Sequence, residues 1–269
     1  MRDSGKLDRS KVASTVATFR DMQAISANPI VRLAALFGRR LPWLRDLPLR
    51  FRCGNHEFRA RPVDLHGSVI SVLVLREYDA LLEFLPRDED LVVVDAGANV
   101  GAFALFLKAE FPTARVVSVE ASPVTYGLLA DNIRRSGWTD WSAYHCALWD
   151  HDGTIAFAHD SRASANSSVV GEGDSARTGS SVPARRLDGL IDEVFPARRI
   201  SLLKLDIEGA EERVLQSVVS LSMIDSVVIE VHAHLVSEEN VLKLLREEFP
   251  RIERLPTSDA DERVYFATR

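Results

Sequence analysis

The sequence contains little cysteine: Cys53 and Cys146 are the two thiols among 269 residues. They lie far apart and lack the spacing of a metal site or of a disulfide framework. A reducing compartment is the simplest explanation of this composition. The amino-terminal residues mix both charges and contain no apolar core, which excludes a signal peptide. We therefore expect a cytoplasmic protein.

Long apolar runs and an excess of basic charge are also missing. No stretch approaches the roughly 18 apolar residues that a membrane span needs, so we expect no membrane span. The net charge is −6, whereas proteins that hold nucleic acid by its phosphates usually present a basic face. We therefore expect no nucleic-acid partner. The sequence leaves the oligomeric state open, a homodimer included.

Two phosphate-binding motifs are absent from the stretch "LVVVDAGANVG", residues 91–101. Gly97 and Gly101 do not make a G-x-G-x-x-G pattern, because Asn99 stands at the second glycine, and no phosphate loop occurs anywhere. An apolar strand followed by Asp-x-Gly-x-x-x-Gly is instead typical of the nucleoside-binding turn of S-adenosylmethionine enzymes. Glycines there would let the backbone approach the cofactor, and Asp95 would accept hydrogen bonds from its α-ammonium group.

Strands and helices alternate regularly from residue 90 onward. The apolar pattern predicts strands at 91–96, 115–120, 142–150, 200–207 and 225–233, with a last strand in "DERVYFAT". Between them we expect helices at 100–110, from Ser122-Pro123 to Gly137, from Gly209 to about Ser222, and in "SEENVLKLLREEF". This alternation predicts an α/β fold with a doubly wound, mostly parallel sheet.

The predicted organisation has two parts. Residues 1–85 form an N-terminal helical and hairpin cap on the substrate side, with a hairpin in "LRFRCGNHEFRARP", a helix in "REYDALLEFLP", and a strand or helix at 67–75. Residues 86–269 form the cofactor-binding domain. Within it, the Ser/Gly-rich segment 159–183 has no apolar period, and we interpret it as a lid loop, with disorder as the alternative.

Glu120 strengthens the cofactor interpretation. It ends the strand "VVSVE", 25 positions after Asp95. A carboxylate at the tip of the neighbouring parallel strand can accept both ribose hydroxyls of a nucleoside. The alternative is that Asp95 and Glu120 are ordinary solvated strand ends.

A second polar cluster follows the strands at 200–207 and 225–233. "LLKLDIEGAE" carries Lys204, Asp206 and Glu208 at one strand end, and in "VVIEVHAH" we expect Glu230, His232 and His234 to alternate onto one face. We expect both sets to meet where a methyl acceptor would lie. The alternative is a pair of rim ion pairs, Lys204–Asp206 and Glu230–His232. Glu211 and Glu212 are interpreted as first-turn acids that match the helix dipole.

The blocks "VVVDAGANVG", "VVSVEASPVTYGLLADNI", "CALWDHDG", "RRLDGLIDE", "LLKLDIEGAEERVL" and "VVIEVH" resemble, in order and spacing, the FkbM-type S-adenosylmethionine methyltransferases. The resemblance covers roughly residues 75–235. It implies the seven-stranded, Rossmann-like class I methyltransferase fold, and methyl transfer, typically to a hydroxyl of a sugar or other secondary metabolite. It also implies a set of cofactor-binding residues: Asp95, Gly97, Asn99, Gly101, Glu120 and Ala121, with Ala147 and Leu148 near the adenine.

An alcohol acceptor must lose a proton, so a base or a metal is required. His232 is the first candidate for the base because its ordinary pKa lies near neutrality; Asp206 is the second, as base or as the group that orients His232. Glu208, Glu230 and Lys204 complete the candidate catalytic set. A rival mechanism places Mg²⁺ on Asp206, Glu230 and His232.

Three classes of function stay open. We expect an O-methyltransferase of a small-molecule or glycosidic acceptor, as in natural product biosynthesis. The alternatives are an N-methyltransferase or protein-directed methyltransferase, and a catalytically silent cofactor-binding module. The Asn/Asp-Pro-Pro-Tyr/Phe motif of base-amino methyltransferases is absent, which weakens the second class.

Overall fold

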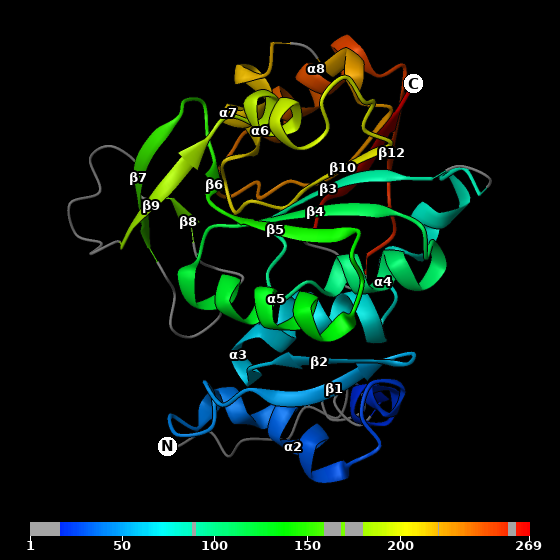
Figure 1. The fold of residues 1–269 in the computed structure, drawn as a ribbon, viewed down its shortest axis with the longest axis vertical. Helices are drawn as coiled ribbons and strands as arrows, with labels where there is room; N and C mark the ends of the chain where they lie inside the picture. Colours follow the sequence, from blue (N-terminus) through cyan, green and yellow to red (C-terminus); the bar gives the residue numbers. More distant parts are fainter. Residues whose placement is uncertain (1–16, 88–89, 159–167, 170–179, 220, 258–261) are drawn as a thin grey trace, which may run out of the picture.

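The computed structural model describes residues 17–87, 90–158, 168–169, 180–219, 221–257 and 262–269 (Figure 1). At its centre is a seven-stranded sheet of order β12-β13-β11-β10-β3-β4-β5. The strands are β3 (Val92–Ala96), β4 (Arg115–Glu120), β5 (Trp141–His145), β10 (Leu202–Leu205), β11 (Ser226–Glu230), β12 (Arg251–Arg254) and β13 (Val264–Thr268). Strand β13 is antiparallel to β11 and β12, while β11, β10, β3, β4 and β5 run parallel. The α/β class and the mostly parallel sheet are confirmed.

Helices cover both faces of the sheet (Figure 1). On one face lie α4 (Ala102–Glu110) and α5 (Pro123–Ser136), and on the other α6 (Leu187–Val194), α7 (Glu211–Ser217) and α8 (Glu238–Glu248). Because successive side chains of β3 point to opposite faces, this strand contributes to the hydrophobic layers on both sides of the sheet. Val93 belongs to the hydrophobic cluster that contains α4, whereas Val92 and Val94 belong to the cluster on the α6–α8 side. Asp95 therefore shares its face with Val93.

The N-terminal segment packs beyond α4 and α5 (Figure 1). Its elements are α2 (Pro29–Phe37), the hairpin β1 (Leu49–Cys53) and β2 (His56–Ala60), α3 (Pro62–Asp64), a π-helical stretch (Leu65–Val74), and 3₁₀ turns at Met22–Ala24, Gly38–Arg40 and Asp79–Glu83. The amide of Asn132 on α5 bonds both the N–H and the carbonyl of Arg59 in β2, at 2.7 and 2.9 Å. Phe51 and Phe58 of the hairpin share one hydrophobic cluster with Phe103 of α4.

Several predicted boundaries are wrong. The run at 142–150 is two strands, because after β5 the chain leaves the main sheet at Cys146; β6 (Ala147–Leu148) then joins a four-stranded sheet with β7 (Gly153–Ala158), β8 (Ser168–Val169) and β9 (Ser180–Arg185). "REYDALLEFLP" forms a single 3₁₀ turn rather than a longer helix. Helix α7 ends at Ser217, and a 3₁₀ turn at Leu221–Met223 follows. Most of the predicted lid, at 159–167 and 170–179, lies outside the described residues.

The order of the sheet reverses between β3 and β10, since the next strand along the chain, β4, lies on the other side of β3. In open α/β sheets, ligands bind at the carboxyl ends of the strands beside such a reversal. A ligand is therefore expected to contact the residues that follow β3, β4, β10 and β11. Across the described ranges, no helix is long and apolar enough to cross a membrane.

Candidate functional site

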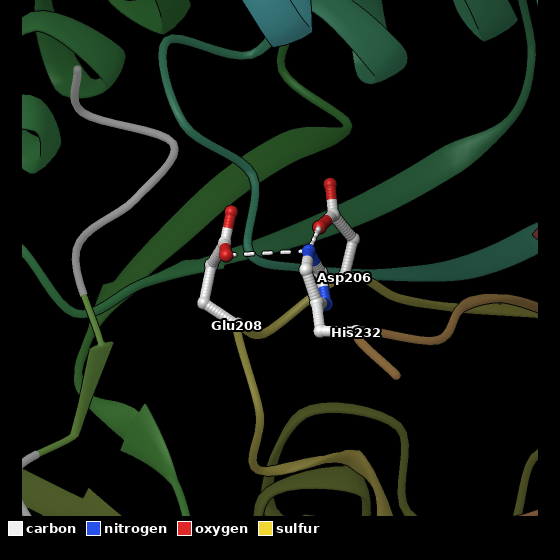
Figure 2. Close-up of side chains that lie close together, drawn as sticks. All are labelled: Asp206, Glu208 and His232. Atoms are coloured by element: carbon white, nitrogen blue, oxygen red, sulfur yellow. Dashed lines mark ion pairs between the residues drawn. The ribbon is translucent and has the colours of Figure 1, made fainter. Parts of the chain in front are cut away.

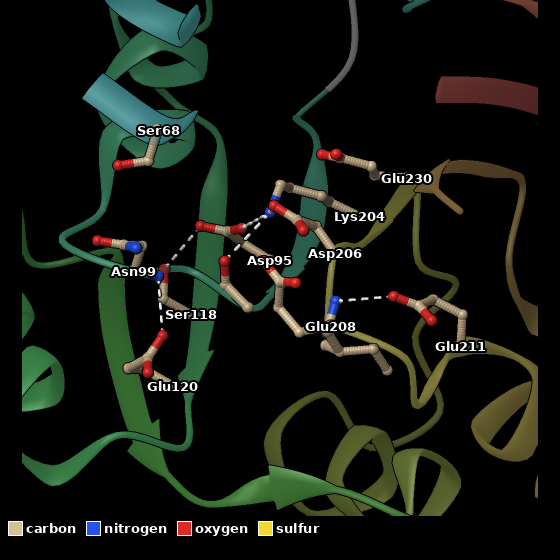
Figure 3. Close-up of polar contacts among 12 residues, drawn as sticks. Ser68, Asp95, Asn99, Ser118, Glu120, Lys204, Asp206, Glu208, Glu211 and Glu230 are labelled. Carbon is tan, nitrogen blue, oxygen red and sulfur yellow. Dashed lines mark hydrogen bonds and ion pairs between the residues drawn. The ribbon is translucent and has the colours of Figure 1, made fainter. Parts of the chain in front are cut away.

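A row of polar side chains crosses the sheet just before the strand ends. Asp95 is in register with Ser118 of β4 and with Lys204 of β10. Since paired residues of neighbouring strands point to the same face, the three side chains meet (Figure 3). Ser118 Oγ donates to Asp95 Oδ2 at 3.3 Å, and Lys204 Nζ lies 3.5 Å from Asp95 Oδ1. The row is buried on the face that α4 covers.

Two residues farther along each strand, a second row forms the carboxyl edge of the sheet. Its members are Glu120 after Ser118, Gly97 after Asp95, Asp206 after Lys204, and Glu230 two positions after Val228. The period of two puts them on the same face as the first row. The predicted cofactor residue Glu120 and the predicted catalytic residues Asp206 and Glu230 thus lie along one edge (Figure 3). The strand order places Gly97, which follows β3, between Glu120 and Asp206.

The carboxylate of Glu120 is fixed by two backbone donors. Oε2 accepts the N–H of Asn99 at 2.9 Å, and Oε1 accepts the N–H of Ser122 at 2.8 Å. The side chain is buried, and this burial raises the pKa of Glu120 to about 7 although both backbone bonds favour the charged form. Glu120 is therefore a preformed acceptor that still lacks part of the stabilisation a carboxylate finds in water.

The turn after β3 is built on left-handed residues. Asn99 has φ +51°, and its Oδ1 accepts the N–H of Val100 at 2.8 Å, a local bond that an asparagine side chain makes readily. This conformation directs the Asn99 N–H at Glu120. Asn99 thus binds the carboxylate of Glu120 with its backbone N–H.

Internal packing requires both glycines of the turn, and their predicted contact with the cofactor stays a prediction. A Cβ on Gly97 would lie 1.6 Å from the carbonyl oxygen of Asp206, and Gly97 has φ +75°. A Cβ on Gly101 would lie 2.7 Å from the ring of Trp141, at φ +90°. Only glycine fits either position. Their role is to let the turn approach β10 and Trp141.

Asp95 is fully buried at the centre of the first row. Burial raises its pKa, and the charge of Lys204 opposes that rise. Its Oδ1 makes the ion pair with Lys204 but has no hydrogen-bond donor among the described residues. A buried acceptor of this kind can still take a donor from a ligand or a water molecule.

His232 lies among four carboxylates beyond the end of β11. Its Nε2 is 3.2 Å from Glu208 Oε2 and 3.9 Å from Asp206 Oδ1 (Figure 2). The same nitrogen is 3.8 Å from Glu230 Oε1. Its Nδ1 donates to Glu211 Oε1 at 2.8 Å. Lys204 Nζ closes the cluster with a contact of 3.1 Å to Asp206 Oδ2. Both predicted ion pairs therefore exist, inside one larger cluster.

The predicted alternation onto one face is wrong for His232 and His234. Strand β11 ends at Glu230, and the carbonyl of His232 accepts the N–H groups of Leu235 and Val236, so the chain has already turned. His232 reaches the cluster from this turn. His234 is exposed, with its ring centroid 6.1 Å from that of His232.

Glu208 enters the cluster from a left-handed backbone position, with φ +52°. It lies between β10 and α7, next to Gly209 at φ +95°. Glutamate rarely adopts this conformation, which costs roughly 1–3 kcal/mol. The contact with His232 is one of the interactions that hold it there.

Burial and crowding dominate the electrostatics of the cluster. Burial, reinforced by Asp206, raises the pKa values of Glu208 and Glu230 to about 8 each. For His232, burial alone would lower the pKa, but the hydrogen bond to Glu211 and the charges of Glu208 and Asp206 outweigh it, and the pKa rises to about 10. At neutral pH the imidazole is therefore protonated on both nitrogens.

Sequence reasoning missed two residues of the site. Glu211 is fully buried and contacts His232, while its neighbour Glu212 is the surface acid that the dipole argument described, bonded to Gln216 and Asn240. Tyr78, from the N-terminal segment, is 4 % exposed against Phe103, and burial followed by the charge of Asp206 holds its pKa well above the usual range. No local signal separates Glu211 from Glu212, because both occupy the first turn of α7.

The residues predicted near the adenine lie close to Glu120. Ala121, the next residue, packs against a small hydrophobic cluster that contains Ala147 and Phe157. The carbonyl of Ala121 also accepts a hydrogen bond from His145 Nε2 at 3.1 Å. Leu148 belongs to the cluster on the α6–α8 side instead. Among these residues, Ala121 and Ala147 therefore adjoin the Glu120 end of the edge, and Leu148 points elsewhere.

One group of three potential metal ligands occurs in the described ranges. It consists of Asp206, Glu208 and His232, whose donor atoms lie within 4.8 Å of one another. The predicted set had Glu230 in the place of Glu208. Two cationic side chains, Lys204 and the imidazolium of His232, already face these carboxylates, and a metal ion would have to displace the proton of His232.

The comparisons with known proteins agree with this architecture. Residues 95–262 match the family described as the Methyltransferase FkbM domain. Methyltransferase 1 of Beauveria bassiana (strain ARSEF 2860) is 27% identical over 172 residues, which cover 57% of this chain and 69% of that protein. Methyltransferase sdnD of Sordaria araneosa is 30% identical over 154 residues, 47% of this chain and 60% of that protein.

A solved structure shows the same fold. The crystal structure of Methyltransferase FkbM from Methylobacillus flagellatus KT has a TM-score of 0.51 at 16% identity, covering 96% of this chain and 60% of that one. The sheet described above is thus the Rossmann-like sheet of class I methyltransferases. Because the family match covers well over half of the sequence, the chain belongs to the FkbM family of methyltransferases.

Proposed function

We propose that the protein is an S-adenosylmethionine-dependent O-methyltransferase that acts on a hydroxyl of a small molecule, sugar or secondary metabolite. One observation carries the proposal: the carboxylates of Glu208 and Glu230 lie beside His232 at the carboxyl end of the sheet that also carries Glu120 (Figure 3). Burial there raises the pKa of each to about 8. An alcohol must give up a proton when its oxygen is methylated, and a base works best when its pKa lies near the working pH. An ordinary carboxylate, with a pKa near 4.5, would be much weaker.

The residues at the turn after β3 suit the cofactor. The fixed, partly destabilised carboxylate of Glu120 would accept the two ribose hydroxyls, and Asp95 Oδ1, which lacks a donor, would accept from the amino-acid end directly or through water. Ala121 and Ala147 would line the adenine. When bound, the sulfonium cofactor supplies an electrophilic methyl group and leaves as a neutral thioether.

We assign the role of base to Glu208 rather than to His232. The imidazole is already protonated at neutral pH, so it has no lone pair with which to accept the hydroxyl proton. Glu208 would take that proton on its carboxylate, while Nε2–H of His232 holds it at 3.2 Å. Lys204 would keep Asp206 in place and limit the build-up of negative charge.

Two measurements test the proposed function: binding of S-adenosylmethionine, and formation of a methylated product. We expect calorimetric titration of the full chain to show micromolar S-adenosylmethionine binding and none for NAD. A panel of hydroxylated acceptors, with amine analogues beside them, should then yield methylated alcohols by mass spectrometry. Binding without product on either panel would favour the silent module, and methylated amines alone would favour the N-methyltransferase.

The substitution Glu208→Gln tests the assignment of Glu208 as the base. Glu208→Gln removes the proton acceptor and should lower kcat about 10²- to 10⁴-fold, while the cofactor Kd stays within about twofold of the wild-type value. Half-buried Glu212→Gln, four residues along the chain and outside the cluster, is the matched control. In the wild type, kcat should rise with pH through a pKa near 8, as Glu208 loses its proton. Turnover abolished by EDTA and restored by Mg²⁺ would instead favour the metal mechanism.

A further inference from the structure

The buried carboxylate of Glu211 has a structural position that its place in the sequence does not explain. It is 0 % exposed at the start of α7, although the first turn of a helix offers its dipole to exposed acids equally well. Taking a carboxylate out of water costs several kcal/mol unless partners compensate for the lost hydration. The partners of Glu211 therefore indicate what it does.

Those partners converge on a single oxygen. Glu211 Oε1 accepts the N–H groups of Ile207 and Gly209 at 3.3 and 3.2 Å, and Nδ1–H of His232 at 2.8 Å. The two backbone bonds tie the carboxylate to the turn that carries Glu208, and Figure 3 shows Glu211 beside that turn. The third bond is shorter and joins it to the only cation in its set of partners. Oε2 has no hydrogen-bond partner in the described part of the chain.

The geometry at His232 continues this chain of contacts. With Nδ1 committed to Glu211, the ring presents Nε2 to Glu208 at 3.2 Å (Figure 2). A carboxylate behind an imidazole fixes both the ring orientation and the nitrogen that keeps the proton. Glu211, His232 and Glu208 thus form a continuous Glu–His–Glu relay between the buried start of α7 and the edge of the sheet.

We propose that Glu211 is a positioning residue, which holds His232 through Nδ1 so that Nε2–H aims the carboxylate of Glu208 at the acceptor. The inference rests on the proposed function, because it assigns Glu211 a part in presenting the base. Glu211 itself touches neither acceptor nor cofactor in this arrangement.

Other charged groups also face the ring and must be accounted for in any test. Glu208, Glu230 and Asp206 face Nε2, His234 lies edge-on at 6.1 Å, and Lys204 contacts Asp206 from the far side. All of these act through Nε2 or at a distance. Glu211 is the described group that contacts Nδ1, so a measurement that separates the two nitrogens isolates its effect.

Nitrogen-15 spectra of the imidazole rings in the full chain provide that measurement. His232 is assigned with the variant His232→Gln, and each ring nitrogen is followed from pH 6 to 11. In the wild type we expect both nitrogens of His232 to be protonated at pH 8. Glu211→Gln should increase the acid dissociation constant of His232 at least tenfold. Glu212→Gln, its half-buried neighbour, which bonds Gln216 and Asn240 instead of His232, should leave that constant unchanged. A Glu211→Gln protein that folds and titrates like the wild type would overturn the proposal.

A second variant keeps the test decisive if Glu211→Gln does not fold. Glu208→Gln leaves Glu211 in place and removes the strongest contact at Nε2, so the neutral ring appears at lower pH. Its remaining proton should lie on Nδ1, where Glu211 accepts it. A neutral ring protonated on Nε2 would refute the role of Glu211. Neither spectrum depends on turnover, so a protein that binds no S-adenosylmethionine would disprove the proposed function without affecting this result.

Discussion

Both oxygens of Glu120 accept a backbone N–H, and this arrangement makes even an isosteric change costly. An amide in place of the carboxylate turns its own N–H toward one of these donors, whichever way it is flipped. We therefore expect Glu120→Gln to raise the Kd for S-adenosylmethionine roughly 10- to 100-fold, the ~1.5–3 kcal/mol of hydrogen bonds to a charged group. Calorimetric titration measures this change directly.

The matched control for Glu120 is Glu239→Gln, an exposed acid on α8. It changes the net charge of the chain by the same amount and should leave the affinity unchanged. Ribose contacts change little as the methyl group moves, so the loss should be one of binding rather than of kcat. Unaltered affinity of Glu120→Gln would remove this residue from the cofactor site.

The positions of single site residues were predictable where a strand end defines them. Asp95, Glu120, Asp206 and Glu230 follow apolar runs, and the period of two places them on one face. Glu211 was not predictable, because its burial depends on His232, which lies 21 positions along the chain and arrives by a turn. The raised pKa values of Glu208, Glu230 and His232 were also not predictable, because they arise only when the folded chain brings these groups together and buries them.

At the scale of elements, Gly97 fixes the distance between the turn after β3 and strand β10. A Cβ there would lie 1.6 Å from the carbonyl oxygen of Asp206, on a backbone with φ +75°. We expect Gly97→Ala to lower the free energy of unfolding by more than about 3 kcal/mol, because overpacking and left-handed strain add. Urea denaturation followed by circular dichroism checks this value.

Gly127, inside α5, is the matched control for Gly97. A Cβ at Gly127 meets no atom within 4 Å, and its backbone is helical. Gly127→Ala should therefore raise the free energy of unfolding by about 0.5–1 kcal/mol, the helix propensity difference between the two residues. Equal effects of the two substitutions would show that the packing of Gly97 against Asp206 is not the determinant.

Element boundaries were predictable where the sequence carries its own stop signals. Helix α5 begins at Pro123 after the N-cap Ser122 and ends before the left-handed Gly137, as expected. The run at 67–75 carries no period or cap that separates strand from helix. In the structure most of it belongs to the π-helical stretch Leu65–Val74. Strand β11 stops at Glu230 although apolar alternation continues, since the chain turns back on itself after Val231.

At the scale of the whole molecule, buried carboxylates make stability depend on pH in an unusual direction. Glu120, Glu208 and Glu230 have pKa values of about 7, 8 and 8 in the folded chain, against an ordinary value of 4.5. The folded state thus binds protons more tightly than the unfolded state. Their contribution to stability is complete below pH 4.5 and is lost as the pH rises through 7 and 8.

His232 also stabilises the folded state less as the pH rises, but at higher pH values than the three carboxylates. Its pKa rises from 6.5 to about 10, so its contribution is complete below pH 6.5 and is lost as the pH rises through about 10. Surface acids oppose this trend only at low pH: the pKa values of Asp131 and Asp188 are lowered chiefly by hydrogen bonds to Arg135 and Arg186, and that contribution is lost in acid. Stability should therefore peak on the mildly acidic side of neutrality.

We expect the Tm of the ligand-free chain to be highest near pH 5–6 and to fall by at least about 5 °C by pH 9. One pKa unit corresponds to about 1.4 kcal/mol, and each kcal/mol moves the Tm of a chain of this size by about 2–4 °C. Calorimetric scans from pH 4 to 10 measure the curve. The double variant Glu208→Gln/Glu230→Gln should flatten its alkaline limb, since glutamine has no proton to lose, whereas exposed Glu239→Gln/Glu247→Gln should not. A wild-type Tm that stays level from pH 6 to 9 would mean that these carboxylates are already ionised at neutrality, and Glu208 would then be too weak a base for the reaction proposed.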